Sequence, residues 1–169
     1  MGTRFKEVNT LSFIGNIGPK TERAWKEVDE EIDIIGWNWG MSNTGTAHLG
    51  GGAGTGKANF QDLSVTKYVD LASTPLLLSC AQGKHVSKAT LTVRKAGGDS
   101  PLEYLIIEMD EVMVSNIQHG GSSGDERTTE VISLNFERMS VKYTEQSKTG
   151  SSGGASPEFK WDILKNQAA

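Results

Sequence analysis

The sequence predicts a mainly β protein: an antiparallel β-barrel or two-sheet sandwich with one flanking α-helix at about residues 73–82. Three observations predict this fold class. Apolar Val, Ile and Leu alternate with polar residues in several segments, which is the two-residue period of strands. Twenty glycines and only four prolines indicate many turns. Two long alternating segments also reverse their apolar parity near their middles, as strands do when a sheet folds over.

The N-terminal quarter combines short strands with a candidate helix. Residues 1–10 are expected to form a loose tail and 11–18 (LSFIGNIG) one short strand. In 19–32 apolar side chains fall at helical spacing, which favours a short helix. In 31–39 (EIDIIGWNW) the apolar parity shifts from even to odd positions, so we expect a strand with a bulge or sharp bend at Gly36.

The clearest helix signal lies at residues 73–82. Ser73 or Thr74 can cap its start, Pro75 fits its first turn, and Gly83 can end it in the left-handed conformation. Helical spacing groups three residues on one face that we expect to be buried: Leu77, Cys80 and Ala81. Cys80, the single cysteine, is then a small buried hydrophobe rather than a nucleophile.

The second half of the chain predicts a run of antiparallel strands. Residues 89–95 (ATLTVRK) alternate cleanly. Residues 103–117 and 129–143 are expected as two long strands joined by a Gly/Ser-rich turn, and pairing places their parity breaks close to opposite one another. A Gly/Ser linker at 146–157 and an alternating strand at 159–163 complete the expected elements. The inward side chains of the first of these strands are expected to be Ala89, Leu91 and Val93.

Composition favours a single domain, residues 1–169, that folds in a reducing compartment, because one cysteine cannot form an internal disulfide. The net charge of −4 argues against a dedicated nucleic-acid surface. No apolar run approaches the ~20 residues of a membrane-spanning helix. The start of the sequence also lacks the pattern of a signal peptide. If the protein leaves the cell, we expect a route that needs no cleaved leader.

A long glycine-rich loop, expected at residues 41–57, contains a nucleotide-binding motif. Gly51–Lys57 has the G-x-x-x-x-G-K spacing of a phosphate-binding loop. Such a loop needs a Ser or Thr after the lysine and a helix whose N-terminus binds the phosphates. Here Ala58 follows, and 58–70 alternates as a strand. We therefore interpret the segment as a loop feeding a strand and not as a nucleotide site.

Other catalytic and metal-binding patterns are weak. The spacing G-x-S-x-G occurs at 120–124 and 150–154, but in Gly/Ser loops before strands rather than at the strand-to-helix turn of a hydrolase. The histidines, His48, His85 and His119, lie in separate segments, unlike the clustered ligands of a zinc site. The sequence therefore predicts no enzyme activity, no catalytic residues, no metal site and no cofactor.

An ordered series of segments carries a family likeness between roughly residues 31 and 166. The segments are WNWGMS, HLGGGAGTGK, QDLSVTKYVD, STPLLLSCAQGKH, ATLTVRKAGG, EYLIIEMDEVMVSNIQHGGS, TEVISLNFERMSVKY and WDILKN. In this order they resemble the haemolysin-coregulated protein (Hcp) family, the tube subunits of bacterial type VI secretion. The resemblance implies a β-barrel-like subunit flanked by a helix. It also implies rings of six subunits, stacked into a tube that a spike protein caps and a contractile sheath surrounds.

The resemblance also implies where the protein acts and what it meets. The subunit assembles in the cytoplasm and is then secreted to the medium or a target cell, with small effectors in the tube lumen. Its partners are other copies of itself, the spike protein, the sheath and the effectors. Neither a nucleic acid nor a membrane span is expected.

Assembly is accordingly the main hypothesis, and its candidate surfaces are two charge clusters and the glycine-rich loop. The acidic cluster at 27–33 and the basic strip at 84–95 are candidates to meet across subunits; the alternatives are pairing within one chain or exposure to water. Exposed pairs contribute only ~0–1 kcal/mol each, so charge alone cannot hold a ring. The candidate interface residues are Glu27, Asp29, Glu30, Thr46, His48, Leu49, Gly50, Gly51, Gly52, Lys57, Lys84, Lys88, Arg94 and Lys95.

Two other classes of protein are the alternatives. One is a monomeric β-barrel that carries a small ligand in its interior, and the other is a nucleotide-dependent enzyme that uses Lys57. Native mass separates the carrier from a ring-forming subunit, and calorimetry with nucleotides tests the enzyme.

We expect Lys57→Ala to change neither nucleotide affinity nor folding, because the sequence around the lysine lacks the other parts of a phosphate site. Titration calorimetry with ATP and circular dichroism measure the two properties. An ATP dissociation constant that is measurable in the wild type and weakens in the variant restores the enzyme hypothesis.

Overall fold

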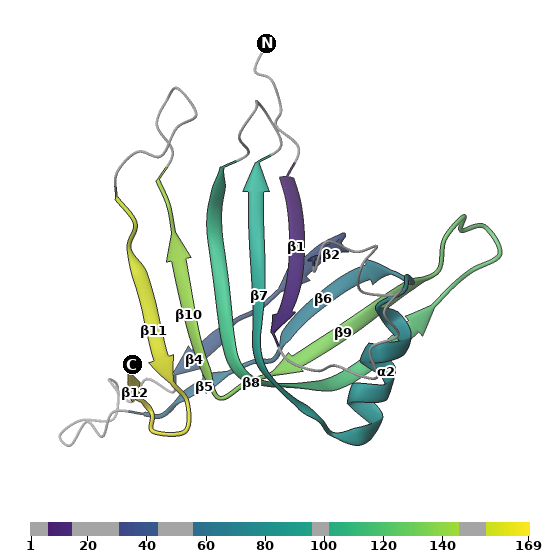
Figure 1. Ribbon diagram of the computed structural model, residues 1–169. Helices are drawn as coiled ribbons and strands as arrows, with labels where there is room; N and C mark the ends of the chain where they lie inside the picture. Colours follow the sequence, from purple (N-terminus) through teal and green to yellow (C-terminus); the bar gives the residue numbers. More distant parts are fainter. Residues whose placement is uncertain (1–6, 15–30, 44–55, 96–101, 146–154) are drawn as a thin grey trace, which may run out of the picture.

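The computed structural model describes residues 7–14, 31–43, 56–95, 102–145 and 155–169 (Figure 1). The described elements, in chain order, are β1 (Glu7–Ile14), β2 (Glu31–Ile34), β3 (Gly36–Asn38), β4 (Met41–Asn43), β5 (Ala58–Phe60), β6 (Leu63–Tyr68), α2 (Ser73–Gln82), β7 (His85–Lys95), β8 (Glu103–Gly120), β9 (Thr129–Asn135), β10 (Arg138–Tyr143), β11 (Glu158–Asp162) and β12 (Gln167–Ala168). This content confirms the predicted mainly β class with a flanking helix.

The strands form two layers that share β8 (Figure 1). The first layer has the order β12-β11-β10-β8-β7-β1-β2, with antiparallel neighbours. The second contains β3, β6, β9 and the far half of β8. No ladder joins β2 to β6 in the described part of the chain, so the sheet is not closed into a full barrel. The two-sheet sandwich is therefore the better of the two predicted descriptions.

The strand β8 serves both layers because it bends where its apolar parity reverses. Ile107 and Met109 are buried before the bend, and Val112 and Val114 after it. Between these pairs Glu111 has a φ of 52°, in the left-handed region that non-glycine residues seldom adopt. The parity break predicted for this strand is confirmed, and its structural cause is this change of direction.

The segment that follows β8 in the chain breaks at the same level. The segment 129–143, predicted as one strand, is two: β9 pairs with the far half of β8 and β10 with the near half. Between them the N–H of Glu137 donates to the carbonyl of Asp110 at 3.1 Å. Met139 is buried after the break, and Tyr143 is exposed at the strand end. The predicted opposition of the two parity breaks is confirmed.

A second corner lies between β2 and β3. Ile32 and Ile34 of β2 are buried, while Ile35 is 49% exposed and marks the bend next to Gly36, as the sequence predicted. Beyond it, Trp37 packs against the core from the other layer. The N–H of Ile35 donates to the carbonyl of Thr66 at 2.7 Å and fixes this corner to β6. The bend lets one continuous segment pair first with β1 and then with β6.

The helix α2 has the predicted bounds but a different buried face. It begins after Ala72 without a side-chain cap, so neither Ser73 nor Thr74 caps it, and Gly83 ends it with a φ of 60°, as predicted. Its buried residues include Leu76 and Ser79, whereas Leu77 is 40% exposed, Ala81 is exposed and Cys80 is half-buried. The expected face was wrong because α2 packs against β8 with a face shifted by one residue, so that Leu76 is buried in place of Leu77 and Ser79 in place of Cys80.

Several element boundaries also differ from the prediction. β1 begins at Glu7, inside the expected tail, because it pairs with β7 from Glu7 to Ile14. β7 begins at His85, four residues before Ala89, and 58–70 contains two strands, β5 and β6. Ala89, Leu91 and Val93 are buried as predicted, and β11 confirms the last strand. The expected helix at 19–32 lies mostly outside the described residues, and its end belongs to β2; the expected linker at 146–157 is described only from 155.

The turn after β11 is stabilised by Asp162. Its Oδ1 accepts the backbone N–H of Lys165 at 2.9 Å. This hydrogen bond is the main reason that the pKa of Asp162 lies below its ordinary range, and the charge of Lys165 acts in the same direction. Because the folded-state pKa is depressed, the contact contributes above the ordinary pKa of an aspartate. It is lost as the pH falls through the depressed value.

We expect Leu76→Ala to destabilise the fold by about 2–5 kcal/mol, because Leu76 has no exposed surface and its truncation leaves a cavity under α2. The matched control on the same helix is Leu77→Ala, which we expect to cost under about 1 kcal/mol because Leu77 is 40% exposed. Guanidinium unfolding followed by circular dichroism measures both. Equal losses of stability in the two variants would show that Leu77 is buried, as the face expected from the sequence requires.

Candidate functional site

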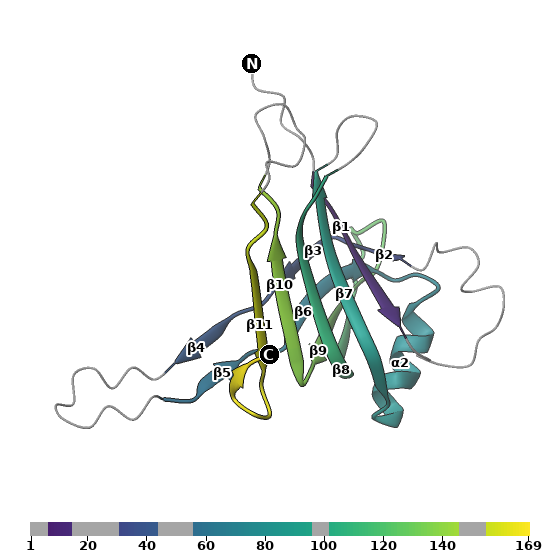
Figure 2. The same ribbon diagram turned by 60° about the vertical axis from the view of Figure 1, so that its left-hand side comes forward.

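The strands β4 and β5 form an arm that leaves the sandwich (Figure 2). The arm continues the hairpin of β3 and β6: Asn38 pairs with Ser64 in the body, and Met41 pairs with Phe60 in the arm. All of β4 is exposed, including Met41 at 45%. The loop predicted at 41–57 is therefore wrong at its start, which is a strand of an exposed hairpin. Residues 44–55 lie outside the described part of the chain.

Many of the candidate interface residues fall outside the described residues, so their placement remains a prediction. Lys57 is described: it is exposed on the arm and leads directly into β5, which is the strand, and not a helix, that the sequence predicted after it. Lys84 is exposed between α2 and β7. The candidates outside the described residues are Glu27, Asp29, Glu30, Thr46, His48, Leu49, Gly50, Gly51 and Gly52.

Arg94 joins the acidic and basic clusters within one chain. Its guanidinium donates two hydrogen bonds to the carboxylate of Glu31, one from Nη1 to Oε2 at 2.9 Å, and its Nε donates to Glu103 at 3.0 Å. The hydrogen bond with Glu31, more than that with Glu103, raises the pKa of Arg94 above its ordinary value, so the charge is permanent. For this pair the structure has the intrachain contact that the sequence left open.

A second group of charges crosses the first layer. Lys88, Asp110 and Arg138 are register partners on β7, β8 and β10, and Lys95 ends β7. Lys88 Nζ lies 3.4 Å from Glu108 and 3.8 Å from Asp110, and Arg138 Nε lies 3.8 Å from Asp110. The side chains in these ion pairs keep partial exposure, so the pairs contribute little stability. They leave this face of the layer hydrophilic and nearly neutral.

Lys67 and Glu130 form a buried ion pair beneath the start of α2. They are cross-strand partners on β6 and β9, and Lys67 Nζ lies 2.6 Å from Glu130 Oε1 with neither side chain exposed. Lys67 Nζ also donates to Asp70 Oδ1 at 2.7 Å and to Ser73 Oγ at 3.3 Å. These contacts satisfy a charge that would otherwise be costly to bury.

Ser73 and His119 extend this buried network. The hydroxyl of Ser73 donates to Glu130 at 2.8 Å and accepts the backbone N–H of Asp70 at 2.9 Å. His119 Nε2 lies 2.8 Å from Glu130 Oε2, although its N–H is not aligned for a hydrogen bond. Ser73 therefore serves the network rather than the helix cap that the sequence suggested, and it fixes the start of α2 to the second layer.

This network was not predicted from the sequence, although the sequence contains a signal for it. Lys67 occupies the same strand parity as Leu63 and Val65, and Glu130 that of Ile132 and Leu134. A lysine and a glutamate at inward positions of two strands predict a buried pair when those strands are neighbours. Sequence alone did not establish that β6 and β9 are neighbours.

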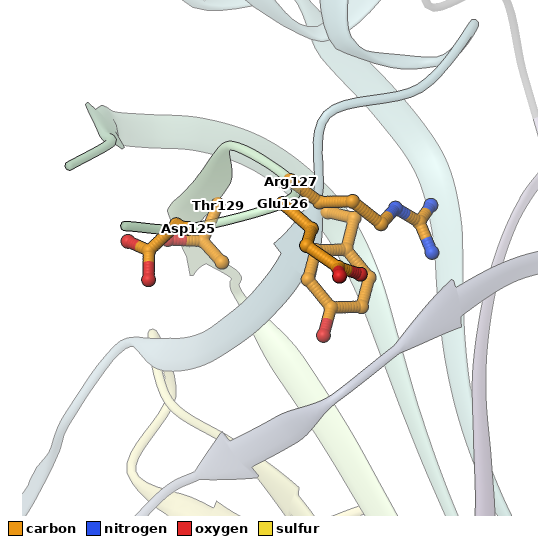
Figure 3. A pocket seen from close by; sticks show the side chains of 5 residues that line it. Asp125, Glu126, Arg127 and Thr129 are labelled. Atoms are coloured by element: carbon orange, nitrogen blue, oxygen red, sulfur yellow. The ribbon is translucent and has the colours of Figure 1, made fainter. Parts of the chain in front are cut away.

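A polar hollow of about 240 Å³ lies beside the turn between β8 and β9 (Figure 3). Tyr68, Asp125, Glu126, Arg127 and Thr129 line it, and the guanidinium of Arg127 lies 4.0 Å from the centre of the Tyr68 ring. Ligand pockets are usually larger, about 300–1,000 Å³, and mostly apolar. This hollow therefore does not favour the alternative of a small-ligand carrier.

The described residues contain no group of three or more His, Cys, Asp or Glu side chains placed to hold a metal ion. Among the helices that the structure describes, none is long and apolar enough to cross a membrane. Apolar side chains are instead exposed where β6 leads into α2, at Tyr68, Val69, Leu71 and Leu77.

A sandwich with a projecting arm and exposed apolar side chains is more typical of a β protein that assembles than of one that binds a small ligand. A family model described as "Type VI secretion system effector, Hcp" matches residues 16–143. The chain is 46% identical over 156 residues to Hcp1 of Pseudomonas aeruginosa, which covers 92% of this chain and 95% of that protein. The chain therefore belongs to the Hcp family of type VI secretion proteins.

Solved structures agree with this assignment. A structure described as a type six secretion system protein has a TM-score of 0.83 at 26% identity and covers 97% of this chain and 100% of that chain. Hcp1 of Salmonella typhimurium has a TM-score of 0.71 at 26% identity, with coverage of 96% and 99%. Both likenesses span nearly the whole chain, so the sandwich, the helix and the arm belong to one family fold.

We expect Lys67→Met to destabilise the fold by about 3–5 kcal/mol, because it leaves Glu130 buried without its cation. The double variant Lys67→Met with Glu130→Leu removes both charges, and we expect it to recover most of the loss. Guanidinium unfolding at pH 7 and fixed protein concentration measures the three proteins. The surface control is Lys142→Met at an exposed position of β10, expected within about 0.5 kcal/mol of wild type. If Lys67→Met is as stable as Lys142→Met, the buried pair contributes nothing to the stability of the fold.

Proposed function

We propose that this protein is the subunit of the inner tube of a type VI secretion system. Six copies close into a ring, rings stack end to end, and the tube is expelled with small effectors in its lumen. Its partners are its own copies, a spike protein, a contractile sheath and the effectors. The subunit assembles in the cytoplasm before it is secreted. Membership of the Hcp family supports this proposal most directly.

The arm is the observation in the structure that best supports assembly. A two-stranded hairpin is marginally stable alone in water, and β4 has an exposed face with Met41 on it. Exposed strand edges pair readily with other chains unless something covers them. An arm that reaches away from its own body is suited to contact a different surface on the next copy. Contacts of that heterologous kind generate closed rings when the rotation between copies closes.

The hydrophilic face of the first layer supports the second part of the proposal, a water-filled lumen. Its charges are paired within the chain, as at Lys88, Asp110 and Arg138. A self-neutralised polar wall does not attract one sign of charge strongly, so it can let proteins of varied charge pass.

We expect size-exclusion chromatography with light scattering to give a closed six-membered ring, because the Hcp resemblance implies six subunits and heterologous contacts form a ring when the rotation between copies closes. Negative-stain microscopy should then show rings. A single monomeric species across micromolar concentrations would overturn the proposal and favour the monomeric carrier.

We expect replacement of 47–54 by a shorter flexible linker to leave the circular dichroism spectrum and unfolding midpoint of the isolated subunit nearly unchanged. The segment holds one large aliphatic residue, Leu49, and many glycines, so it can bury little apolar surface in its own domain. The same change should weaken rings or their stacking, and with them secretion, as seen by light scattering and microscopy. If the shortened protein fails to fold, the segment belongs to the core and its proposed role is wrong.

A further inference from the structure

Four aromatic rings form a ladder between the arm and the C-terminal strand β11. The Phe60 ring of β5 lies 6.1 Å from the ring of Trp39 and 6.3 Å from that of Trp161, measured between ring centres. Trp161 in turn stacks on Phe159 at 6.3 Å with an interplanar angle of 5°. In both views β5 leaves the body close to the end of β11 and to β12 (Figures 1 and 2). The ladder thus connects the base of the arm to the edge of the first layer.

The backbone provides an irregular joint at this same place. Between the pairs Asn38–Ser64 and Met41–Phe60, one strand contributes two residues and the other three. A strand pair with one extra residue on one side bends and twists locally. Across the joint the N–H of Gln61 donates to the carbonyl of Gly40 at 3.0 Å. Gly40 leaves room for the Gln61 side chain, which would lie 3.3 Å from a Cβ at this position.

A joint of this kind permits the arm to point in more than one direction unless side chains hold it. The aromatic pairs are the contacts placed to do so, because Phe60 belongs to the arm while Trp161 and Phe159 belong to the body. Offset aromatic pairs at these separations are favourable beyond the area that they bury. Trp39, Phe60 and Phe159 also pack against the core of the sandwich, which gives the ladder a rigid base.

The indole N–H groups do not explain the arrangement. Within the described residues, the buried Nε1 atoms of Trp39 and Trp161 meet no hydrogen-bond acceptor. Buried donors without partners are unfavourable, so the tryptophans are not placed here to make hydrogen bonds. Ring-to-ring contact, tilted between Trp39 and Phe60 and stacked between Phe60 and Trp161, is the interaction that these positions serve.

We propose that four positioning residues set the direction of the arm: Trp39, Phe60, Trp161 and Phe159. Because two of them lie on β11, this strand controls which surface the arm meets on another copy. The consequence for assembly rests on the proposed function of the arm. The ladder itself is a property of one chain and can be tested on a single chain.

The direct test measures the direction of the arm with two spin labels. Ser42→Cys on exposed β4 and Lys142→Cys at an exposed position of β10 carry the labels, in a background with Cys80→Ala. Labelled chains are diluted into unlabelled ones, so that only distances within one chain contribute. Wild type should give one narrow distance distribution. Phe60→Leu removes both of its ring pairs, and we expect the undocked fraction of the arm to rise by about tenfold, seen as a broad or second distance peak.

Two matched variants make the test specific. Phe136→Leu is the same substitution at a buried core residue that is not one of the four ladder rings, and it should lower stability while leaving the distance distribution narrow. Trp161→Phe keeps a stacking ring and removes the unpaired N–H, so it should keep the narrow distribution without loss of stability. A narrow distribution in Phe60→Leu, or equal broadening in Phe136→Leu, would overturn the ladder as the element that aims the arm.

The second readout separates this inference from the proposed function. Negative-stain microscopy of Phe60→Leu should show fewer stacked rings than Phe136→Leu at the same protein concentration. If the arm is released and the rings stack normally, the link from the ladder to assembly is wrong while the ladder still aims the arm. If wild type forms no rings at all, the proposed function fails, and the label distances still decide on the ladder.

Discussion

A strand that serves two layers must change which of its sides faces the core, and the architecture depends on this constraint. In β8 the change occurs at Glu111, where the backbone adopts a positive φ and the buried parity passes from Met109 to Val112. Because β9 pairs with the far half of β8 and β10 with its near half, the bend determines where β9 ends and β10 begins. The corner at Ile35 has the same role on the other side, where one segment passes from β1 to β6. The enclosed core and the hairpin that carries the arm both follow from these two corners.

The sequence predicted the features that local pattern determines. Parity breaks revealed both corners, since reversal of a two-residue period is visible in one segment without knowledge of its neighbours. The left-handed conformation of Gly83 and the start of α2 at Ser73 were also predicted, because both depend on local sequence. The buried face of the helix was wrong, because the side of α2 that meets β8 depends on tertiary packing and the apolar residues LLL offer several faces.

The candidate site was less predictable because its parts come from distant segments. The ion pair of Lys67 with Glu130 needs β6 and β9 side by side, and the aromatic ladder needs β5 beside β11. Pairing between strands so far apart leaves little local signal, although the inward parity of Lys67 was one. The strand β4 escaped detection because three exposed residues beside a glycine-rich stretch have no apolar alternation. The family resemblance was confirmed, but it did not predict these contacts.

The topology has a consequence for the order in which the chain folds. The strands β7, β9 and β10 all pair with β8 and lie close to it in sequence, so these contacts are comparatively local. The strands β1 and β6 make their ladders with distant partners, for example Leu11 with Leu91 and Leu63 with Leu134. Contacts between remote segments form slowly, because a long loop must close first. On the ribosome the N-terminal strands therefore emerge well before the strands that cover them, and their edges are open to other chains during that interval.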